Sequence, residues 1–384
     1  MKEGWEYKKL GDVCSFMSGY TPQKEELNNK SGVPYFKVSD MNRDENGYEM
    51  NRTELFVKRP KKIFPVGAII FPKNGGAIFT EKKRFLVCDS IIDLNTEAIL
   101  ANESFLKKEY LFYLLTKIKI STFDNGGGLP SVNIKKMCDY EICIPPLPEQ
   151  QSIVDYLDSA FAKIDTMKAN AEKALNEAKA LFQASLKDML EPKKGWEEKY
   201  LKEIAEYSIG LTYKPTDVCD DGTIVLRSSN IQDGKLDLND IVRVNTSIKE
   251  KLYVQCGDIL MCSRNGSARL VGKVCIIPEL KERMTYGTFM MVIRSAYNPF
   301  LYHYFDTDLF RRQIKHGEAN MINQITRYML DDVKLNLPPI KEQQSIVATL
   351  DSLKSKVDRL QANYDKISQE CDALKQAILR HVFE

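Results

Sequence analysis

The sequence lacks the patterns by which compact metal and catalytic sites are usually recognised. Its nine cysteines include no CxxC pair, and the closest spacings, Cys138 with Cys143 and Cys256 with Cys262, have no histidine nearby to complete a zinc site. Only three histidines occur in 384 residues, which leaves few candidates for a general base. We therefore expect reduced, buried thiols and no metal.

Long apolar runs are also missing. No stretch of about 18 apolar residues occurs, and the start MKEGWEYKKL lacks the apolar core of a signal peptide. We therefore expect a cytoplasmic protein. The 43% hydrophobic content is typical of a globular chain, and 384 residues exceed the size of one ordinary core, so two or more domains are expected.

Motifs for nucleotides and for methyl transfer are absent. There is no GxxxxGK[ST] loop, and the stretch 125–128 neither follows a clear strand nor opens a helix as a dinucleotide-binding loop must. Methyltransferases of exocyclic amino groups resemble one another in an Asn/Asp-Pro-Pro-aromatic motif, but the segments 144–147 and 337–340 lack its polar first and aromatic fourth residues. No GxSxG turn occurs either. We expect no catalytic residue and no cofactor in this chain.

The chain also lacks a large excess of positive or of negative charge. The net charge is +2, which is weak for a nucleic-acid binder, because DNA affinity depends largely on Lys and Arg neutralising phosphates. The small surplus is nevertheless concentrated: residues 1–147 hold 22 basic against 19 acidic side chains, and residues 192–340 hold 21 against 19.

What the sequence does contain is an internal repeat. A Gly-Trp-Glu tripeptide opens both halves, and a Pro-Pro-x-x-Glu-Gln-Gln-Ser-Ile-Val segment occurs in both. The matches, in chain order, are 4–6 with 195–197, Gly19 with Gly210, 67–75 with 257–266, and 145–154 with 338–347. Because the matches are collinear, the chain consists of two copies of one unit.

Each copy ends in a predicted long helix, at 148–191 and at 341–384. Apolar residues recur there at alternating spacings of four and three, the pattern of a coiled-coil seam. The seam positions are Ile153, Leu157, Ala160, Ile164, Met167, Ala171, Ala174, Ala178 and Leu181, then Ile346, Leu350, Leu353, Val357, Leu360, Tyr364, Ile367, Cys371, Leu374 and Ile378. We expect the two helices, each about 60 Å long, to pair with each other antiparallel.

The remaining segments, 1–147 and 192–340, predict two globular domains. Short β-rich runs at 68–71, 84–87, 223–226 and 273–277 are separated by Gly, Asn and Asp, and one amphipathic helix is expected near 104–119 and near 299–315. The fold class is therefore α+β: two homologous globular domains, each followed by a long helix, with pseudo-twofold symmetry.

Polar and basic residues in the loops of both domains could read DNA, since base edges and phosphates are contacted mainly by Arg, Lys, Asn, Gln and Ser. A surface turn is the alternative for each one taken singly. The candidates are Ser39, Asn42, Arg43, Lys73, Asn74, Asn125, Ser131 and Asn133 in the first domain, and Arg227, Ser228, Asn230, Arg264, Asn265, Arg269, Asn323, Gln324 and Arg327 in the second.

The order of these features resembles the specificity subunit of type I restriction-modification systems over the whole chain. The resemblance rests on the Gly-Trp-Glu openings, the segment 257–267 and the two Glu-Gln-Gln helix starts. It implies two target-recognition domains that read the halves of a bipartite DNA site. It also implies methyltransferase subunits, two of them, and translocating restriction subunits as partners, with S-adenosylmethionine and ATP bound by those partners.

Partner docking is expected around Gln150, Gln151, Gln343 and Gln344. One departure between the copies is the loop 126–130, Gly-Gly-Gly-Leu-Pro, where the second copy has Gly-Glu-Ala-Asn-Met at 317–321. A coiled-coil scaffold that contacts no DNA is the alternative function, and salt-sensitive DNA binding would distinguish the two.

Overall fold

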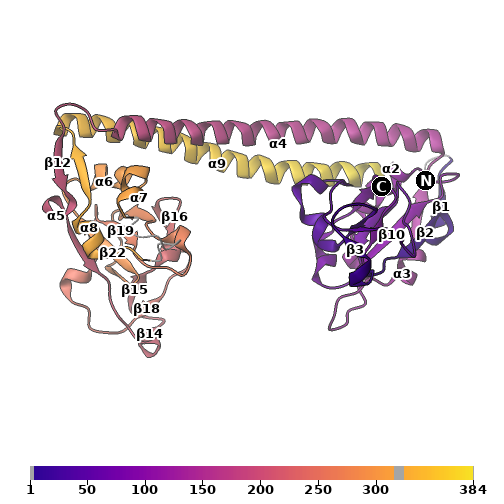
Figure 1. Cartoon of the computed structure of the whole chain (residues 1–384), viewed down its shortest axis with the longest axis horizontal. Coiled ribbons are helices and arrows are strands. Elements are labelled where there is room, and N and C mark those ends of the chain that lie inside the picture. Colours follow the sequence, from indigo (N-terminus) through magenta and orange to yellow (C-terminus); the bar gives the residue numbers. More distant parts are fainter. Residues whose placement is uncertain (1–3, 315–323, 384) are drawn as a thin grey trace. The chain divides into compact units, whose positions relative to one another are not determined.

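The computed structural model describes residues 4–314 and 324–383, and these form two compact units. Unit 1 comprises Met1–Ala171 with Tyr364–Glu384, and unit 2 comprises Glu172–Asn363. Each unit is an α+β domain packed on part of a pair of long helices (Figure 1).

In unit 1, a five-stranded sheet of order β2-β10-β7-β8-β5 lies beside a four-stranded sheet of order β3-β6-β4-β9, and β1 pairs with β11. The strands are β1 (Glu6–Lys9), β2 (Cys14–Ser18), β3 (Leu27–Asn28), β4 (Val33–Phe36), β5 (Glu49–Met50), β6 (Phe56–Val57), β7 (Ile69–Pro72), β8 (Arg84–Leu86), β9 (Ile91–Ile92), β10 (Thr96–Ala101) and β11 (Glu141–Ile144). The short helices are α1 (Leu10–Val13), α2 (Lys108–Lys117) and α3 (Ile134–Cys138).

Unit 2 has the same topology apart from one strand, with sheets of order β13-β22-β19-β20 and β14-β18-β15-β21 and a β12-β23 pair. Where unit 1 adds β5 to the edge of its larger sheet, unit 2 has a separate β16-β17 pair. The strands are β12 (Glu197–Tyr200), β13 (Glu206–Ile209), β14 (Val218–Cys219), β15 (Thr223–Leu226), β16 (Ile231–Gln232), β17 (Lys235–Leu236), β18 (Arg243–Val244), β19 (Ile259–Cys262), β20 (Val274–Ile276), β21 (Met284–Tyr286), β22 (Met290–Arg294) and β23 (Lys334–Leu337). The short helices are α5 (Leu201–Ile204), α6 (Asn298–Tyr304), α7 (Asp308–Gln313) and α8 (Arg327–Asp331).

The helix predicted near 299–315 is divided in two. Thr307 ends α6, because its hydroxyl donates to the carbonyl of Tyr304, and it caps α7 by accepting from the backbone N–H of Phe310. A threonine that satisfies both helix ends favours a break that apolar periodicity does not reveal.

The repeated glycines mark a close approach of two chain segments in each unit. A Cβ on Gly19 would lie 1.9 Å from the carbonyl oxygen of Asp93, and one on Gly210 would lie 2.2 Å from that of Tyr286. Only glycine therefore fits where β2 and β13 pass the turn that precedes β10 and β22.

The long helices are α4 (Leu147–Leu190) and α9 (Ile340–Phe383), and they run antiparallel within each unit. In unit 1, Lys375 Nζ lies 2.5 Å from Asp165 and Lys168 Nζ lies 3.5 Å from Asp372. In unit 2, Lys179 Nζ donates to Gln361 Oε1 at 2.7 Å. Residue numbers rise along one helix as they fall along the other, which confirms the predicted antiparallel coiled coil.

The predicted seam of α4 was partly wrong. Met167, Ala174 and Leu181 are exposed, whereas Phe161, Leu175 and Phe182 are buried. The predicted seam and the buried one are both apolar, and both contain Leu157 and Ile164. The spacing of apolar residues therefore does not show which of the two is buried. The structure buries the stripe with the larger aromatic side chains, since these remove more apolar area from water. Leu374 of α9, another predicted seam position, is exposed too.

Each unit has a core built from sheet, short helices and the long helices. In unit 1 it joins Ile69 and Phe71 of β7 to Leu111 of α2 and Val154 of α4.

Within the described residues, no helix is both long and apolar enough to cross a membrane. The expectation of buried thiols fails at Cys88 and Cys256, which are exposed.

Candidate nucleic-acid interface

At one edge of the first domain, a turn between β9 and β10 organises the surrounding loops. The buried Asp93 accepts from the backbone N–H of Asn95 at 3.0 Å, from the Thr96 hydroxyl at 2.8 Å and from the N–H of Val38 at 3.4 Å. Asn95 in turn accepts from the amide of Asn74 at 3.4 Å. One carboxylate thus connects the loop that carries Ser39 to the loop that carries Asn74.

Four of the predicted DNA contacts come together beside this turn. Asn74 and Ser131 form a β-bridge, Val132 N–H donates to the carbonyl of Lys73 at 2.8 Å, and Asn125 Nδ2 donates to Ser131 Oγ at 3.0 Å. The ammonium of Lys73 points inward, 3.0 Å from the buried carboxylate of Glu97. Lys73 therefore braces the edge, while the side chains of Asn125 and Asn74 lie at its surface.

The other predicted residues of this domain have mixed surroundings. Ser39 and Asn42 are exposed on the turn Val38–Asn42, and Asn42 Oδ1 accepts from Lys82. The guanidinium of Arg43 is held by Asp40 at 3.0 Å and Glu54 at 3.1 Å. Asn133 caps α3 by accepting from the N–H of Lys136 at 2.9 Å.

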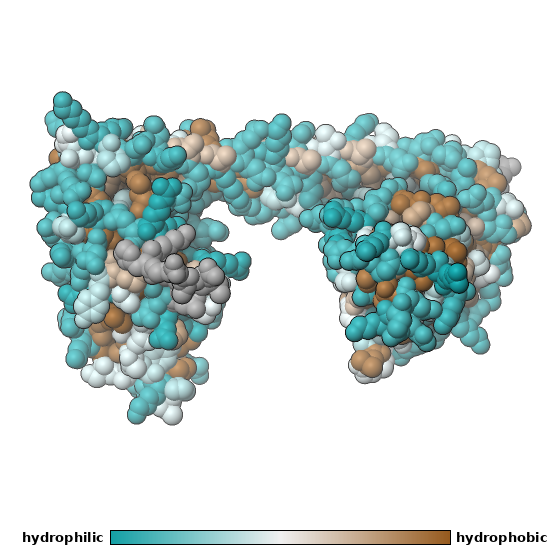
Figure 2. Space-filling view, viewed as in Figure 1, coloured by the Kyte–Doolittle hydropathy of each residue, from teal (hydrophilic) through white to brown (hydrophobic). Residues whose placement is uncertain are grey.

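Between Asn125 and Ser131 the chain forms a loop that projects from unit 1 (Figure 1). Leu129 lies on it with 85% of its surface exposed, and Figure 2 shows an apolar protrusion at this edge. Leu129 is not among the residues predicted from the sequence, which are all polar or basic. A large apolar residue among three glycines was the available signal, because apolar side chains contact thymine methyl groups and base steps.

The second domain gathers a corresponding set around a groove of about 750 Å³. Arg227 and Ser228 line it together with Phe289, whose ring is 55% exposed. Asn265 Nδ2 donates to Ser228 Oγ at 3.1 Å, which joins two of the predicted loops. The guanidinium of Arg227 donates to Asp240 at 2.8 Å.

Arg264 and Gln324 form a β-bridge, and the exposed guanidinium of Arg264 lies 5.4 Å from the centre of the Phe289 ring. Arg269 is exposed and has no ion pair with any residue in 4–314 or 324–383. Arg327 opens α8 with its guanidinium 5.8 Å from the Tyr207 ring. Asn323 lies outside the described residues.

Asn230 is fully buried, although the sequence suggested a base contact. Its amide donates to the carbonyls of Asp237 and Asp240 at 2.8 Å, and its oxygen accepts from the N–H of Arg227 at 2.8 Å. These bonds hold the loop in shape, so we leave Asn230 out of the proposed interface.

The repeat points to residues that loop composition did not. In the first domain Lys37 N–H donates to Asp40 as Arg227 N–H donates to Asn230, which makes Lys37 the counterpart of Arg227. By the same register Asn95 matches Phe289, since each immediately precedes the strand β10 or β22. An alignment of the two copies could have identified both residues.

The four glutamines predicted to dock partners fall into two classes. Gln150 is fully buried: it donates to the carbonyls of Phe105 and Pro145 and accepts from the N–H of Lys107. Gln343 is also buried and donates to the carbonyl of Pro338. Gln151 and Gln344 are exposed.

The two sequence motifs of the repeat prove to be one local structure. The indole of Trp5 donates to Glu149 at 3.0 Å, and that of Trp196 donates to Glu342 at 3.2 Å. The Gly-Trp-Glu opening is thus bound to the glutamate that precedes each glutamine pair.

Among the described residues, no group of His, Cys, Asp and Glu side chains could hold a metal ion.

Comparison with known proteins identifies the duplicated unit. A family model described as the type I restriction modification DNA specificity domain matches residues 2–177 and again residues 193–369. The specificity subunit of the type I restriction enzyme EcoKI from Escherichia coli K12 is 24% identical, over 100% of this chain and 89% of its own. That of MjaVIII from Methanocaldococcus jannaschii is 24% identical, over 93% and 87%.

Two solved structures share the fold. A chain from a study of complex assembly and conformational transition of the type I R-M system has a TM-score of 0.77 at 20% identity, over 100% of this chain and 98% of its own. The HsdS subunit of Thermoanaerobacter tengcongensis has a TM-score of 0.55 at 20% identity, over 100% and 97%. Since the family model matches both halves, this chain belongs to the family of type I restriction-modification DNA specificity proteins.

Proposed function

We propose that this chain is the non-catalytic DNA-reading subunit of a type I restriction-modification complex. The observation that carries the proposal is that one scaffold occurs twice with different side chains at the same edge. Where unit 1 has Lys37 and Asn95, unit 2 has Arg227 and Phe289. A shared scaffold keeps the geometry of DNA approach, and divergent side chains allow two unlike half-sites to be read.

The residues proposed to face DNA are at least partly exposed at these edges and are not held by an ion pair to a buried carboxylate or by a helix cap, as Arg43 and Asn133 are. They are Lys37, Ser39, Asn42, Asn74, Asn95, Asn125, Leu129 and Ser131 in the first domain, and Arg227, Ser228, Arg264, Asn265, Arg269, Phe289, Gln324 and Arg327 in the second. Lys73, Asp93 and Asn230 would brace these loops from within.

We keep the division of the chain into 1–147, 148–191, 192–340 and 341–384 as part of this proposal. The two helical segments would connect the recognition domains and dock methyltransferase and restriction subunits, with Gln151 and Gln344 on the docking surface. Those partners would bind S-adenosylmethionine and ATP, and the purified chain alone should transfer no methyl group.

Exchange of one domain tests the proposal. Residues 1–147 are replaced by the equivalent domain of a related specificity subunit with a different half-site, and the chimera is assembled with methyltransferase subunits. Because Glu149 and the glutamine pair of α4 are retained, assembly should survive. Sequencing of methylated adenines should show one half-site changed and the other retained.

A change in both half-sites would contradict independent reading. The alternative, a scaffold without DNA contact, predicts no DNA affinity for this chain by itself and therefore no dependence on salt. The proposed reader should instead lose DNA affinity steeply as salt rises.

A further inference from the structure

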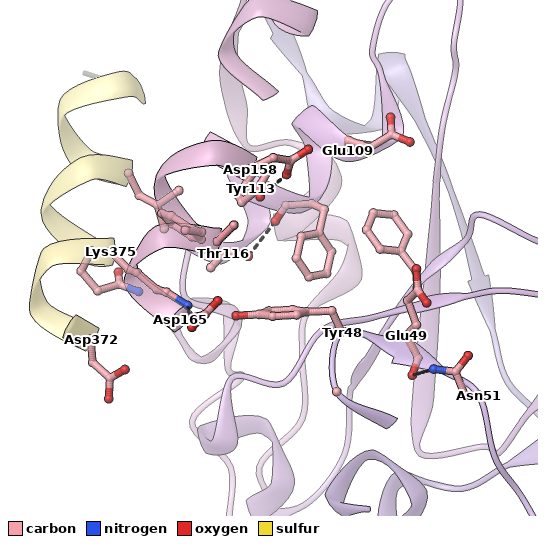
Figure 3. Close-up of a pocket in the computed structure, with 17 residues that line it drawn as sticks. Tyr48, Glu49, Asn51, Glu109, Tyr113, Thr116, Asp158, Asp165, Asp372 and Lys375 are labelled. Atoms are coloured by element: carbon pink, nitrogen blue, oxygen red, sulfur yellow. Dashed lines mark hydrogen bonds and ion pairs between the residues drawn. The ribbon is translucent and has the colours of Figure 1, made fainter. Parts of the chain in front are cut away.

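Unit 1 contains a groove of about 720 Å³ where the loop 47–51 and α2 face α4 and α9 (Figure 3). Five aromatic rings line it, and each contacts at least one other ring, with centroids 4.6 to 6.1 Å apart. The contacting pairs are Phe85 with Phe112, Tyr48 with Phe112, Phe112 with Tyr113, and Tyr113 with Phe161. The groove thus has an apolar, aromatic wall.

Its charged lining is strongly acidic. The carboxylates are Glu49, Glu109, Asp158, Asp165 and Asp372, and the one cation among the described lining residues is Lys375. That ammonium is already satisfied, because it lies 2.5 Å from Asp165 and 5.1 Å from the centre of the Phe161 ring. An acidic surface repels phosphates, so this groove does not suit DNA.

Lys375 does not neutralise the remaining carboxylates. Burial by itself would lower the pKa of Lys375, but the carboxylate of Asp165 and the hydroxyl of Tyr48, which points toward it in Figure 3, outweigh burial and raise that pKa. Asp158 accepts from the Tyr113 hydroxyl at 2.5 Å, a neutral donor. Outside the lining, Lys168 Nζ lies 3.5 Å from Asp372 and Lys108 Nζ lies 3.8 Å from Glu109. Among the described residues, Glu49 and Asp158 are the lining carboxylates that no ion pair neutralises, so the groove keeps a surplus of negative charge beside its aromatic wall.

The equivalent place in unit 2 shows what such a groove accepts. Lys235 opens β17 where Glu49 opens β5, and its ammonium lies 2.6 Å from Asp358, the counterpart of Asp165 on the other long helix. The groove there is smaller, about 240 Å³, and its charged lining consists of the cations Lys273, Arg311 and Lys354 and the carboxylates Asp233 and Asp306. The groove of unit 2 therefore lacks the acidic surplus of the groove in unit 1.

We propose that the groove of unit 1 binds a lysine or arginine side chain of the methyltransferase subunit. The unpaired carboxylates of the groove attract the partner's cation, and its aliphatic stem packs on the aromatic wall. This inference rests on the proposed function, since it deepens the docking of the methyltransferase onto the helix pair. It makes that docking asymmetric, because the groove of unit 2 is smaller and has no acidic surplus.

The E49K substitution, which copies Lys235, tests the inference. The new ammonium should remove one of the unpaired carboxylates, add a positive charge to the groove and repel the partner's cation. The full chain is titrated with the methyltransferase subunit by isothermal titration calorimetry at 0.1 and 0.4 M salt. Of the two methyltransferase sites expected, the one at unit 1 should bind roughly tenfold more weakly in E49K at 0.1 M salt and show less salt dependence, with E49Q intermediate, while the site at unit 2 should be unchanged.

The control is E103K, which makes the same charge change at an exposed residue of unit 1 outside the groove and should stay within about twofold of the original chain. Thermal melting by circular dichroism checks that each variant folds. If E49K binds as the unsubstituted chain does, the groove proposal is wrong and the proposed function stands. If the unsubstituted chain binds no methyltransferase, both are wrong.

Discussion

Gln150 and Gln151 are neighbours at the start of α4, yet their side chains have opposite surroundings. Gln150 is buried and makes three hydrogen bonds to backbone groups of Phe105, Lys107 and Pro145. Gln151 is exposed and donates to Asp155 on the next turn. The first glutamine therefore connects α4 to the domain, and the second is available to a partner.

We expect Gln150→Ala to destabilise unit 1 by roughly 2–4 kcal/mol, because it leaves buried carbonyls and an N–H without partners. Urea unfolding followed by circular dichroism measures this loss. Gln151→Ala is the matched control and should change stability by no more than about 0.5 kcal/mol while weakening methyltransferase binding. Equal losses of stability in the two variants would contradict the division of roles.

His303 of unit 2 takes the place that Tyr113 has in unit 1. Its ring is 3% exposed and lies 2.9 Å from Asp351, where unit 1 has Tyr113 bonded to Asp158. Burial lowers the pKa of His303 below 6.5, and the nearby Asp351 and Asp306 only partly oppose this. The neutral ring is therefore the form that the folded unit 2 prefers.

The consequence is a pH dependence of unit 2. Below pH 6.5 the unfolded chain takes up a proton at His303 more readily than the folded chain, so stability is retained above that pH and falls as the pH drops through it. The urea midpoint should decline between pH 8 and pH 5.5. His303→Gln should reduce this decline, and an unchanged pH profile in that variant would count against the assignment.

Among the secondary-structure elements, α4 and α9 make the same kind of contact with each other in both units. Lys375 of α9 lies over Phe161 of α4 at 5.1 Å in unit 1, and Lys354 of α9 lies over Phe182 of α4 at 5.9 Å in unit 2. Phenylalanine on α4 meets lysine on α9 in both cases. Such pairs fix the register of the two helices and cover the aromatic rings with lysine stems.

Inserting four strong helix formers after Lys179 should lengthen α4 by roughly 6 Å. Four residues form a stutter, which a coiled coil absorbs by local unwinding rather than by melting, so assembly should persist. DNA rises about 3.4 Å per base pair, and the spacer between the half-sites should therefore grow by one or two base pairs. Methylation mapping that returns the original spacing would show that the helices do not set it.

At the scale of the whole molecule, the weak net charge of +2 limits what the chain does alone. Several of its basic side chains at the edges proposed to face DNA are already paired, as Lys73 is with Glu97 and Arg43 is with Asp40. Affinity for phosphates should therefore depend on basic surface contributed by partners, while this chain contributes the choice of sequence.

The sequence by itself determined the duplication, the α+β class and the antiparallel helix pair. These follow from local patterns: matched motifs in register, alternating apolar spacings and turn residues between β-rich runs. It also located the loops at 73–75, 125–131, 227–230 and 264–269 that meet at the domain edges. Local pattern suffices where each residue's role depends on its neighbours in the chain.

Tertiary structure decided the roles of the individual polar residues. Only packing reveals that Asn230 and Gln150 are buried, that Arg43 is paired, and that Phe161 rather than Met167 faces the seam. The contrast between Glu49 and Lys235 likewise has meaning only once the helix that each faces is known. Burial and pairing depend on groups distant in sequence, and a linear pattern does not encode which of two similar side chains those groups will cover.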